Sequence, residues 1–278
     1  MARNKKTAAR AWTRLDNAAK IFPPSNMGTN TSVFRFSCTL KEMVQPELLQ
    51  QALDKAVEKF PAYFVVMKSG AFWYYFEETG QKPKVVPETR AVCGPLWEEG
   101  SRELLFEVSW FKERINLEMF HALTDGTGAV AFLKTIVYYY LLAAHPDGFG
   151  ETPPVLPEEA SEAARSSDSF RKYYKPVHGK KGKKGGPRAW NIRGQGAGRE
   201  DLLIIEGVAP VKAVLDAAHS FGTTMTVYLT AVFIEALRKE MPASAERRPV
   251  VLGVPVNLRP YFPSDTVRNF FGMIDVSY

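Results

Sequence analysis

The chain has 278 residues, of which 45% are hydrophobic and 24% are charged, and its formal net charge is +6. This length can bury a sizeable core in one large or two medium domains, and the composition excludes a chain that is mainly disordered. No stretch approaches the roughly 20 apolar residues of a membrane-spanning helix, and the basic N-terminus leads into no apolar run, which predicts a cytoplasmic protein without membrane insertion.

The first part of the chain predicts a strand, a helix and a hairpin. Thr31–Leu40 has the composition of a strand, and Pro46–Phe60 places its apolar residues on one side of a helix that the proline would start. Tyr63–Met67 and Phe72–Phe76 flank a polar turn at 68–70 and predict a hairpin. The aromatic residues of the second segment are expected in the core of that hairpin rather than in a ligand site.

Two further strands and a long helix follow. Ser101–Trp110 and Glu113–Phe120 are apolar or alternating segments around a tight polar break, which is typical of antiparallel strands. Gly128–Ala144 carries apolar residues at helical spacing, with hydroxyl and carboxylate side chains before it that could cap its first turn. The predicted order of this half is therefore strand, helix, four strands, helix.

The residues between the last of these strands and the helix read H-x-x-x-D-G, with His121, Asp125 and Gly126. A histidine on a strand-to-helix turn can be oriented toward a cleft, where its near-neutral pKa suits proton abstraction. Two plainer interpretations stay open at this point. The histidine could be a core residue, and the carboxylate could serve only as a helix cap.

The positive charge of the chain is concentrated in one segment. Residues 171–188 hold eight lysines and arginines and no acidic residue, which is more than the whole excess of basic side chains. Glycines and prolines interrupt the segment and favour an exposed linker over a packed basic face. Because no nucleic-acid-binding motif accompanies the charge, we expect no nucleic-acid partner.

The remaining residues predict a second, shorter set of elements. Asp201–Val208, Val250–Val256 and Phe270–Val276 have the composition of strands, and Val211–Ser220 and Thr224–Lys239 that of helices. The pattern indicates an α+β fold of two-layer α/β sandwich lobes joined by a linker. The predicted domains are 1–165, an N-terminal lobe with the H-x-x-x-D-G motif; 166–200, a basic Gly/Lys-rich linker; and 201–278, part of a C-terminal lobe.

Neither the cysteines nor the other histidines point to a site. Cys38 and Cys93 lie far apart, without metal-ligand spacing, and are expected to pack in or beside strands. His145, His178 and His219 have the surroundings of loop or surface residues. The sequence therefore predicts no metal site.

Several segments together resemble the chloramphenicol acetyltransferase-like superfamily, in its condensation-domain and alcohol-acetyltransferase-like branch. They are WTRLDNAAKIFP near the N-terminus, VFRFSCTL, LLQQALDKAVEKFP and FWYYFEE, FHALTDGTGAVAFLKT around the motif, and LGVPVNLRPYF and VRNFFG near the C-terminus. The branch usually carries two adjacent histidines at the start of its motif. Here Phe120 replaces the first, and His121 matches the second.

The resemblance implies a fold of two similar lobes with the active site in a tunnel between them. It implies that His121 is the catalytic base and that Asp125 is structural, in a salt bridge with an arginine that Arg259 matches best. Gly126 and Gly128 are expected to permit close backbone approach or a positive φ. A D-F-G-W-G-like segment of the family is absent, which predicts a complete N-terminal lobe and a C-terminally truncated second lobe.

The function implied is transfer of an acyl group, with acetyl as the leading choice, from a coenzyme A thioester to an alcohol or amine. The acyl-CoA would be a co-substrate, with no permanently bound cofactor, and the partners would be that donor and a small-molecule acceptor. A condensation domain that uses phosphopantetheine thioesters on an acyl or peptidyl carrier protein is the alternative, as is a non-catalytic scaffold. No G-x-S-x-G motif or paired cysteine and histidine indicates a covalent intermediate.

The basic segment provides the first prediction. Replacement of Lys180, Lys181, Lys183 and Lys184 by serine should leave the thermal unfolding curve unchanged, because an exposed linker adds little to the core. If the segment attracts the phosphates of a donor, the variant should bind acyl-CoA more weakly and with less dependence on salt. Unchanged binding at low and at high ionic strength would favour a plain linker.

Overall fold

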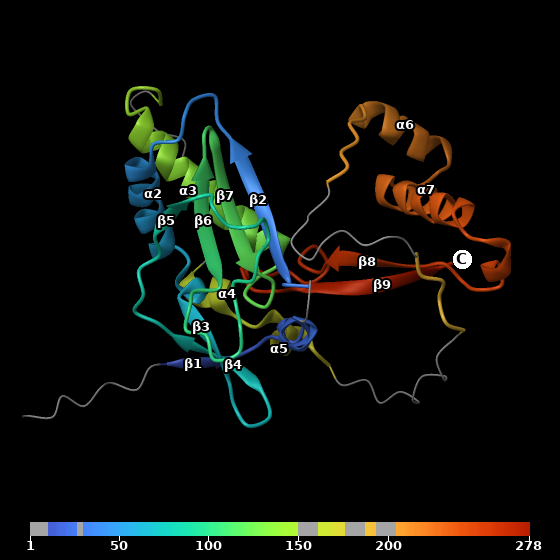
Figure 1. Cartoon of the computed structure of the whole chain (residues 1–278), viewed down its shortest axis with the longest axis horizontal. Helices are drawn as coiled ribbons and strands as arrows, with labels where there is room; N and C mark the ends of the chain where they lie inside the picture. Colours follow the sequence, from blue (N-terminus) through green and yellow to red (C-terminus); the bar gives the residue numbers. More distant parts are fainter. Residues whose placement is uncertain (1–10, 27–29, 150–160, 176–186, 193–203) are drawn as a thin grey trace, which may run out of the picture. The chain divides into compact units, whose positions relative to one another are not determined.

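The computed structural model describes residues 11–26, 30–149, 161–175, 187–192 and 204–278. These residues form two compact units (Figure 1). Unit 1 extends to Tyr174 and includes Leu258–Phe271, and unit 2 comprises Lys175–Asn257 and Gly272–Tyr278. The sequence placed residues 258–271 in the second lobe, but they pack within unit 1. That the two units correspond to the two lobes stays a prediction.

The strands are β1 (Trp12–Arg14), β2 (Val33–Thr39), β3 (Val65–Ser69), β4 (Tyr74–Glu78), β5 (Val85–Pro87), β6 (Phe106–Phe111), β7 (Arg114–Phe120), β8 (Val251–Asn257) and β9 (Phe271–Ser277). The helices are α1 (Phe22–Ser25), α2 (Pro46–Glu58), α3 (Gly126–Ala144), α4 (Glu162–Ser166), α5 (Ser169–Tyr173), α6 (Val211–Ser220) and α7 (Met225–Lys239). Short 3-10 turns are η1 (Ala19–Ile21), η2 (Pro61–Tyr63) and η3 (Ala243–Ala245).

The main sheet of unit 1 has the order β2-β7-β6-β5, with β5 parallel to β6 and the other pairs antiparallel. Figure 1 shows α2 and α3 side by side along one face of this sheet. Alternate residues of β7 point to that face, and Ile115, Leu117 and Met119 are fully buried there. The apolar stripe of α2 and the inner residues of α3 complete the core.

The opposite face of the sheet carries a network of paired charges beside apolar residues such as Phe120. Arg35 of β2 donates to Glu118 of β7, which is directly opposite in the register, and it also pairs with Glu88. Arg114 and Asn116 donate to the second oxygen of Glu88, at 2.8 and 3.0 Å. Because each buried charge has a partner of opposite sign, this face can be covered without an isolated ion.

Most of the elements predicted for unit 1 are confirmed, with the hairpin shifted. Its turn lies at Gly70–Trp73, where the Gly70 N–H donates to the Trp73 carbonyl, and not at 68–70. Phe72 and Trp73 are therefore at the exposed tip, with 92% and 60% of their surface accessible, and only Phe76 enters the core. The sequence also missed the short strands β1 and β5, whose pairing depends on distant residues.

The expectation that no stretch approaches a membrane-spanning helix is wrong for α3, which is long and apolar enough, by length and composition alone, to cross a membrane. The bent pair α6 and α7 would pass the same test as one span. In unit 1, however, α3 buries Phe132, Ile136 and Tyr140 against α2 and the sheet. The core helix of a globular protein has the same composition, so these helices are weak evidence of a membrane span.

Unit 2 contains α6, α7 and a two-stranded sheet of β8 and β9. The strand predicted at 201–208 is wrong for residues 204–208, which have no regular structure. Ile205 and Val208 are almost completely exposed there. Residues 201–203 lie outside the described residues. An apolar composition alone cannot create a strand without a partner edge. Helix α7 leaves Val232 and Phe233 about half exposed.

The N-terminal segment of unit 1 contains a buried carboxylate, Asp16. One oxygen accepts from the Ala19 N–H at 2.8 Å, and the other lies 3.6 Å from the Arg268 Nε. Burial raises the pKa of Asp16 to about 6, although the nearby Arg268 charge opposes this effect. The folded state therefore binds the Asp16 proton more tightly than the unfolded chain does.

The second prediction follows from this pKa. Stability should fall as the pH rises from about 4 to about 6, because Asp16 then loses its proton in a buried site. Asp16→Asn keeps the acceptor for Ala19 and should be more stable than the parent at pH 7, by about 3 kcal/mol at most. Urea unfolding at pH 4 and pH 7 measures this difference. A variant less stable than the parent at pH 7 but not at pH 4 would show that the ionised carboxylate is favourable.

Candidate active site

His121 lies where β7 ends, in the turn that leads to α3. Its backbone N–H donates to the Ser32 carbonyl at 2.8 Å, and the next turn is closed by the Leu123 N–H and the Phe120 carbonyl. The last residues of β7 pair with β2 and β6, so the turn rests on two strands. The sheet thereby fixes the backbone that carries the histidine.

Aromatic side chains surround the His121 ring. Phe22 stacks on it at 4.2 Å between centroids with 14° between the planes, Phe34 meets it edge-on at 4.9 Å, and Phe271 is tilted at 5.7 Å. Burial lowers the pKa of His121 from its ordinary value, against smaller opposing effects that include the Asp125 charge. The neutral imidazole, which can accept a proton, is therefore favoured near pH 7.

Asp125 caps α3 and pairs with Arg259. One carboxylate oxygen accepts from the Thr127 and Gly128 N–H groups at 3.1 and 3.2 Å, and the other accepts from the Phe270 N–H at 2.8 Å. Arg259 donates to both oxygens, at 2.8 and 3.2 Å. Both side chains are about nine-tenths buried. Arg259 is therefore the salt-bridge partner that the resemblance implied for Asp125, and both residues belong to unit 1.

Arg259 also holds the chain that precedes β9. Its guanidinium donates to the Thr266 carbonyl at 2.9 Å and to the Arg268 carbonyl at 2.8 Å. No hydrogen bond between the side chains of Asp125 and His121 occurs in the described part of the chain. The carboxylate therefore positions the turn and the 266–270 segment rather than the imidazole itself.

The two glycines of the motif differ in what they require. A Cβ at Gly128 would lie 2.2 Å from the Val267 carbonyl oxygen and 2.3 Å from the Thr124 hydroxyl, so this position has no room for a side chain. A Cβ at Gly126 would meet only the Phe36 ring, at 3.6 Å. The expected close approach thus occurs at Gly128, whereas the backbone at Gly126 does not demand glycine.

Phe120 stands where the family usually has its first histidine. It is fully buried and stacks on Trp97, with ring centroids 5.7 Å apart. Beside it, the Thr124 hydroxyl and the Tyr63 hydroxyl both donate to the Val267 carbonyl. Burial raises the pKa of Tyr63 above its ordinary value, so its phenol stays protonated and remains a donor. A buried core residue therefore occupies the position at which the resemblance implies a histidine.

Sequence reasoning missed two residues that touch the histidine turn. Phe22 stacks on the ring, and Asn269 donates from Nδ2 to the carbonyls of His121 and Ala122 at 3.0 and 3.2 Å. Both lie in segments that carried the family resemblance, KIFP and VRNFFG. Neither is adjacent to the motif in sequence, so only their segments, and not their roles, could be recognised.

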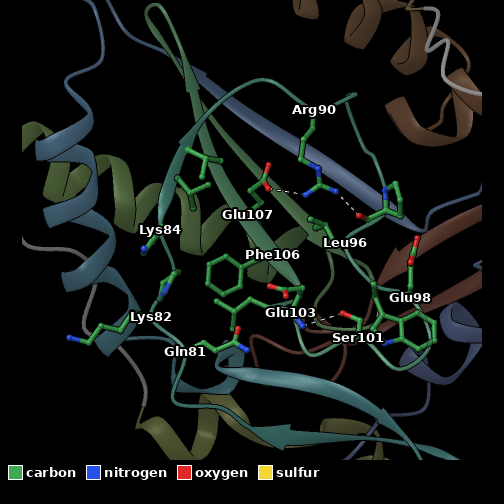
Figure 2. A pocket seen from close by; sticks show the side chains of 16 residues that line it. Gln81, Lys82, Lys84, Arg90, Leu96, Glu98, Ser101, Glu103, Phe106 and Glu107 are labelled. Carbon is green, nitrogen blue, oxygen red and sulfur yellow. Dashed lines mark hydrogen bonds and ion pairs between the residues drawn. The ribbon is translucent and has the colours of Figure 1, made fainter.

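A separate hollow of about 430 Å³ lies beside β6 (Figure 2). Its floor includes Leu96 and Phe106, and charged side chains such as Lys84 and Glu103 stand around it. Arg90 crosses it to donate to Glu107 at 3.0 Å. His121 does not line this hollow, so we do not assign it to the same site.

Among the described residues, no group of three or more histidine, cysteine or acidic side chains could hold a metal ion. Cys38 and Cys93 are free and half-buried. Cys93 packs on the polar face of the sheet, where its N–H donates to Glu118 at 2.6 Å. Burial raises the pKa of both thiols, which disfavours the thiolate form that binds metals or attacks carbonyls.

No protein-family model matches the chain, and no curated protein sequence matches it. Solved structures do match, and the three named here each cover 96% of this chain at 14% sequence identity. They include polyketide synthase associated protein 5 from Mycobacterium tuberculosis (TM-score 0.57, 67% of that chain), the first condensation domain of the calcium-dependent antibiotic synthetase in complex with a substrate analogue (0.57, 68%), and F. graminearum TRI101 complexed with coenzyme A and T-2 mycotoxin (0.61, 70%).

The likeness to these structures shows that the chain has the chloramphenicol acetyltransferase-like fold. The α+β class expected from the sequence is confirmed. The chain spans about two thirds of the length of these proteins. At 14% identity the likeness shows the fold alone. Truncation of the second lobe, and the roles of the motif residues, stay predictions.

The buried ion pair gives the third prediction. Asp125→Ala should reduce the free energy of unfolding by about 3–5 kcal/mol, and Arg259→Ala by less, because Asp125 then keeps three backbone donors. The double variant should cost clearly less than the sum of the two.

Urea unfolding of the single and double variants measures this coupling. The matched control is Arg90 and Glu107, a more exposed pair also in unit 1, whose coupling should be about 1 kcal/mol or less. Strict additivity for Asp125 and Arg259 would contradict the prediction.

Proposed function

We propose that the chain forms all or part of an acyltransferase in which His121 is the general base. The observation that carries this proposal is the setting of the His121 ring, which three aromatic side chains enclose and which burial keeps neutral. Its Nδ1 is buried without a hydrogen-bond partner, and we therefore propose Nε2 as the nitrogen that meets a substrate. A neutral imidazole with one accessible nitrogen is suited to proton abstraction.

The proposed reaction is direct transfer from a thioester. Nε2 of His121 takes the proton from an acceptor hydroxyl or amine while the acceptor oxygen or nitrogen attacks the thioester carbonyl carbon. The carbon–sulfur bond then breaks, and the imidazolium returns the proton to the departing thiolate. Such a base contributes roughly 10²–10⁴-fold to the rate, and the rest must come from positioning and charge stabilisation.

The fold supports a thioester donor without deciding which one. TRI101 was solved with coenzyme A, and other structures of similar fold are condensation domains of the rhizomide synthetase and of the calcium-dependent antibiotic synthetase. We therefore propose acyl-CoA as the first donor to test, with an alcohol as acceptor. A thioester on the phosphopantetheine of a carrier protein is the second candidate.

The fourth prediction concerns the base. Thiol release from a panel of acyl-CoA donors, and from an acylated carrier protein, should fall at least 100-fold in His121→Ala, because a general base is removed. The rate in the parent should rise with pH through a midpoint below 6.5, since burial lowers the pKa of His121.

His219→Ala is the matched control, because His219 is exposed on α6 and should not affect the rate. Melting curves should show that both variants fold. Undiminished turnover in His121→Ala would refute the assignment of the base. Donor binding by the parent without any thiol release would favour a non-catalytic scaffold.

A further inference from the structure

The Phe22 ring lies almost parallel to the His121 imidazole. The two ring centroids are 4.2 Å apart, and the planes are inclined by only 14°. Phe34 meets the same imidazole at 4.9 Å with its plane inclined by 62°, and Phe271 lies at 5.7 Å with its plane inclined by 52°. Of these three rings, Phe22 is therefore the one that covers a face of the imidazole.

The plane of an imidazole is fixed only if something outside the side chain holds it. The bond between Cβ and the ring of a histidine has broad torsional minima, so the side chain itself leaves the plane free. Histidines that act as bases are usually held by a hydrogen bond at the second ring nitrogen. Among the residues that the structure describes, His121 Nδ1 has no hydrogen-bond partner. The aromatic contacts are then what sets the plane of this ring.

The helix that carries Phe22 and the turn that carries His121 share one anchor, Ser32. Phe22 is the first residue of α1, and the hydroxyl of Ser25, the last residue, lies 3.4 Å from the Ser32 hydroxyl. The Ser32 carbonyl accepts the backbone N–H of His121 at 2.8 Å. One residue of the chain thereby contacts both the element with the phenyl ring and the turn with the imidazole.

The chain on both sides of α1 is also fixed within unit 1. After the helix, Asn26 donates from Nδ2 to the Trp97 carbonyl at 2.9 Å. Before it, the Asp16 carboxylate accepts from the Ala19 N–H at 2.8 Å, and both of these residues are buried. Phe22 therefore belongs to a short segment whose two ends are tied to the rest of the unit.

We propose that Phe22 is a positioning residue for His121, whose ring fixes the plane of the imidazole and closes one of its faces. The lone pair of an imidazole nitrogen lies in the plane of the ring, so a base with a fixed plane takes a proton from one direction. The role of Phe22 in turnover rests on the proposed function, in which His121 is the base. The stacked pair itself is a property of the folded chain and can be measured without turnover.

The first measurement is the NMR spectrum of the histidine ring protons in the parent chain, at a pH where the imidazoles are neutral. Protons above the face of a phenyl ring are shifted upfield by its ring current. The His121 ring protons should therefore lie upfield of those of His219, which is exposed on α6. His121→Gln assigns the signals, by their loss. His121 signals at the position of the His219 signals would overturn the proposal whatever the variants do.

Variants then test whether Phe22 sets the plane. Phe22→Leu keeps an apolar side chain but removes the flat ring, so the imidazole should turn more freely. The cross-peaks between the rings of His121 and Phe34 report this freedom without involving position 22, and they should weaken in Phe22→Leu. Phe22→Tyr keeps the ring and should retain them. Cross-peaks of parent strength in Phe22→Leu would show that the plane is set without Phe22.

Turnover separates positioning from stability. In the thiol-release assay, Phe22→Leu should lower kcat by about 10-fold or more and leave the KM for the donor unchanged, because the base is present but less well oriented. Phe22→Tyr should retain most of the parent rate. A parent-like kcat in Phe22→Leu would refute the positioning role.

Phe64→Leu is the matched control. Phe64 is also a half-buried aromatic residue of unit 1, but its ring contacts Phe106, at 6.3 Å. This variant should leave both the His121 spectrum and the rate unchanged. Equal losses in Phe22→Leu and Phe64→Leu would mean that any lost aromatic contact disturbs the site, which would refute a specific role for Phe22.

The two proposals fail in different ways. If the spectra show that Phe22 fixes the imidazole but His121→Ala leaves thiol release unchanged, the proposed function fails and the orienting contact stands. If thiol release depends on His121 but Phe22→Leu keeps the parent rate and cross-peaks, the assignment of Phe22 fails and the base survives. If Phe22→Leu does not fold, Phe22→Met, which also lacks a flat ring, takes its place in both measurements.

Discussion

The buried pair of Asp125 and Arg259 is the interaction on which the candidate site depends. It joins the start of α3 to residues 266–270, which are more than 130 positions away in the sequence, and it does so with the charge of each side chain balanced by the other. An unpaired charge at this depth would cost several kcal/mol, so each partner requires the other. Because Phe270 also donates to Asp125, the pair sets the place of Asn269 and Phe271 beside His121.

The candidate site is therefore built from four separate parts of unit 1. The end of β7 provides His121, the N-terminal segment provides Phe22, β2 provides Phe34, and the segment before β9 provides Asn269. None of these parts could orient the imidazole alone. The sheet holds the backbone of the turn, and the Phe22 and Phe34 rings pack against the imidazole. A base of this kind is prepared by its surroundings before any substrate arrives.

The polar face of the main sheet and the separate hollow show that burial alone does not mark a site. The charges of Arg35, Glu88 and Glu118 are paired with one another, and Arg114 joins them through Glu88, although its Nε is a buried atom without a hydrogen-bond partner. The hollow beside β6 has room for a small molecule, yet its charges are mixed and His121 is not among its lining residues. The turn at His121 differs, because three aromatic rings contact an imidazole there within a rigid frame.

The sequence by itself predicted the α+β class, the four longer helices α2, α3, α6 and α7 and most of the long strands, because local periodicity carries that information. The resemblance to the superfamily implied the salt bridge of Asp125 with Arg259, which is present, whereas the catalytic role of His121 stays a prediction. The sequence did not predict the short helices α1, α4 and α5. It failed where an element depends on distant partners. The short strands β1 and β5 form only against β4 and β6, and residues 204–208 have a strand's composition but no strand beside them. Only the tertiary structure decided that Phe22 and Asn269 meet His121, since nothing local links three positions that are separated by about a hundred residues or more.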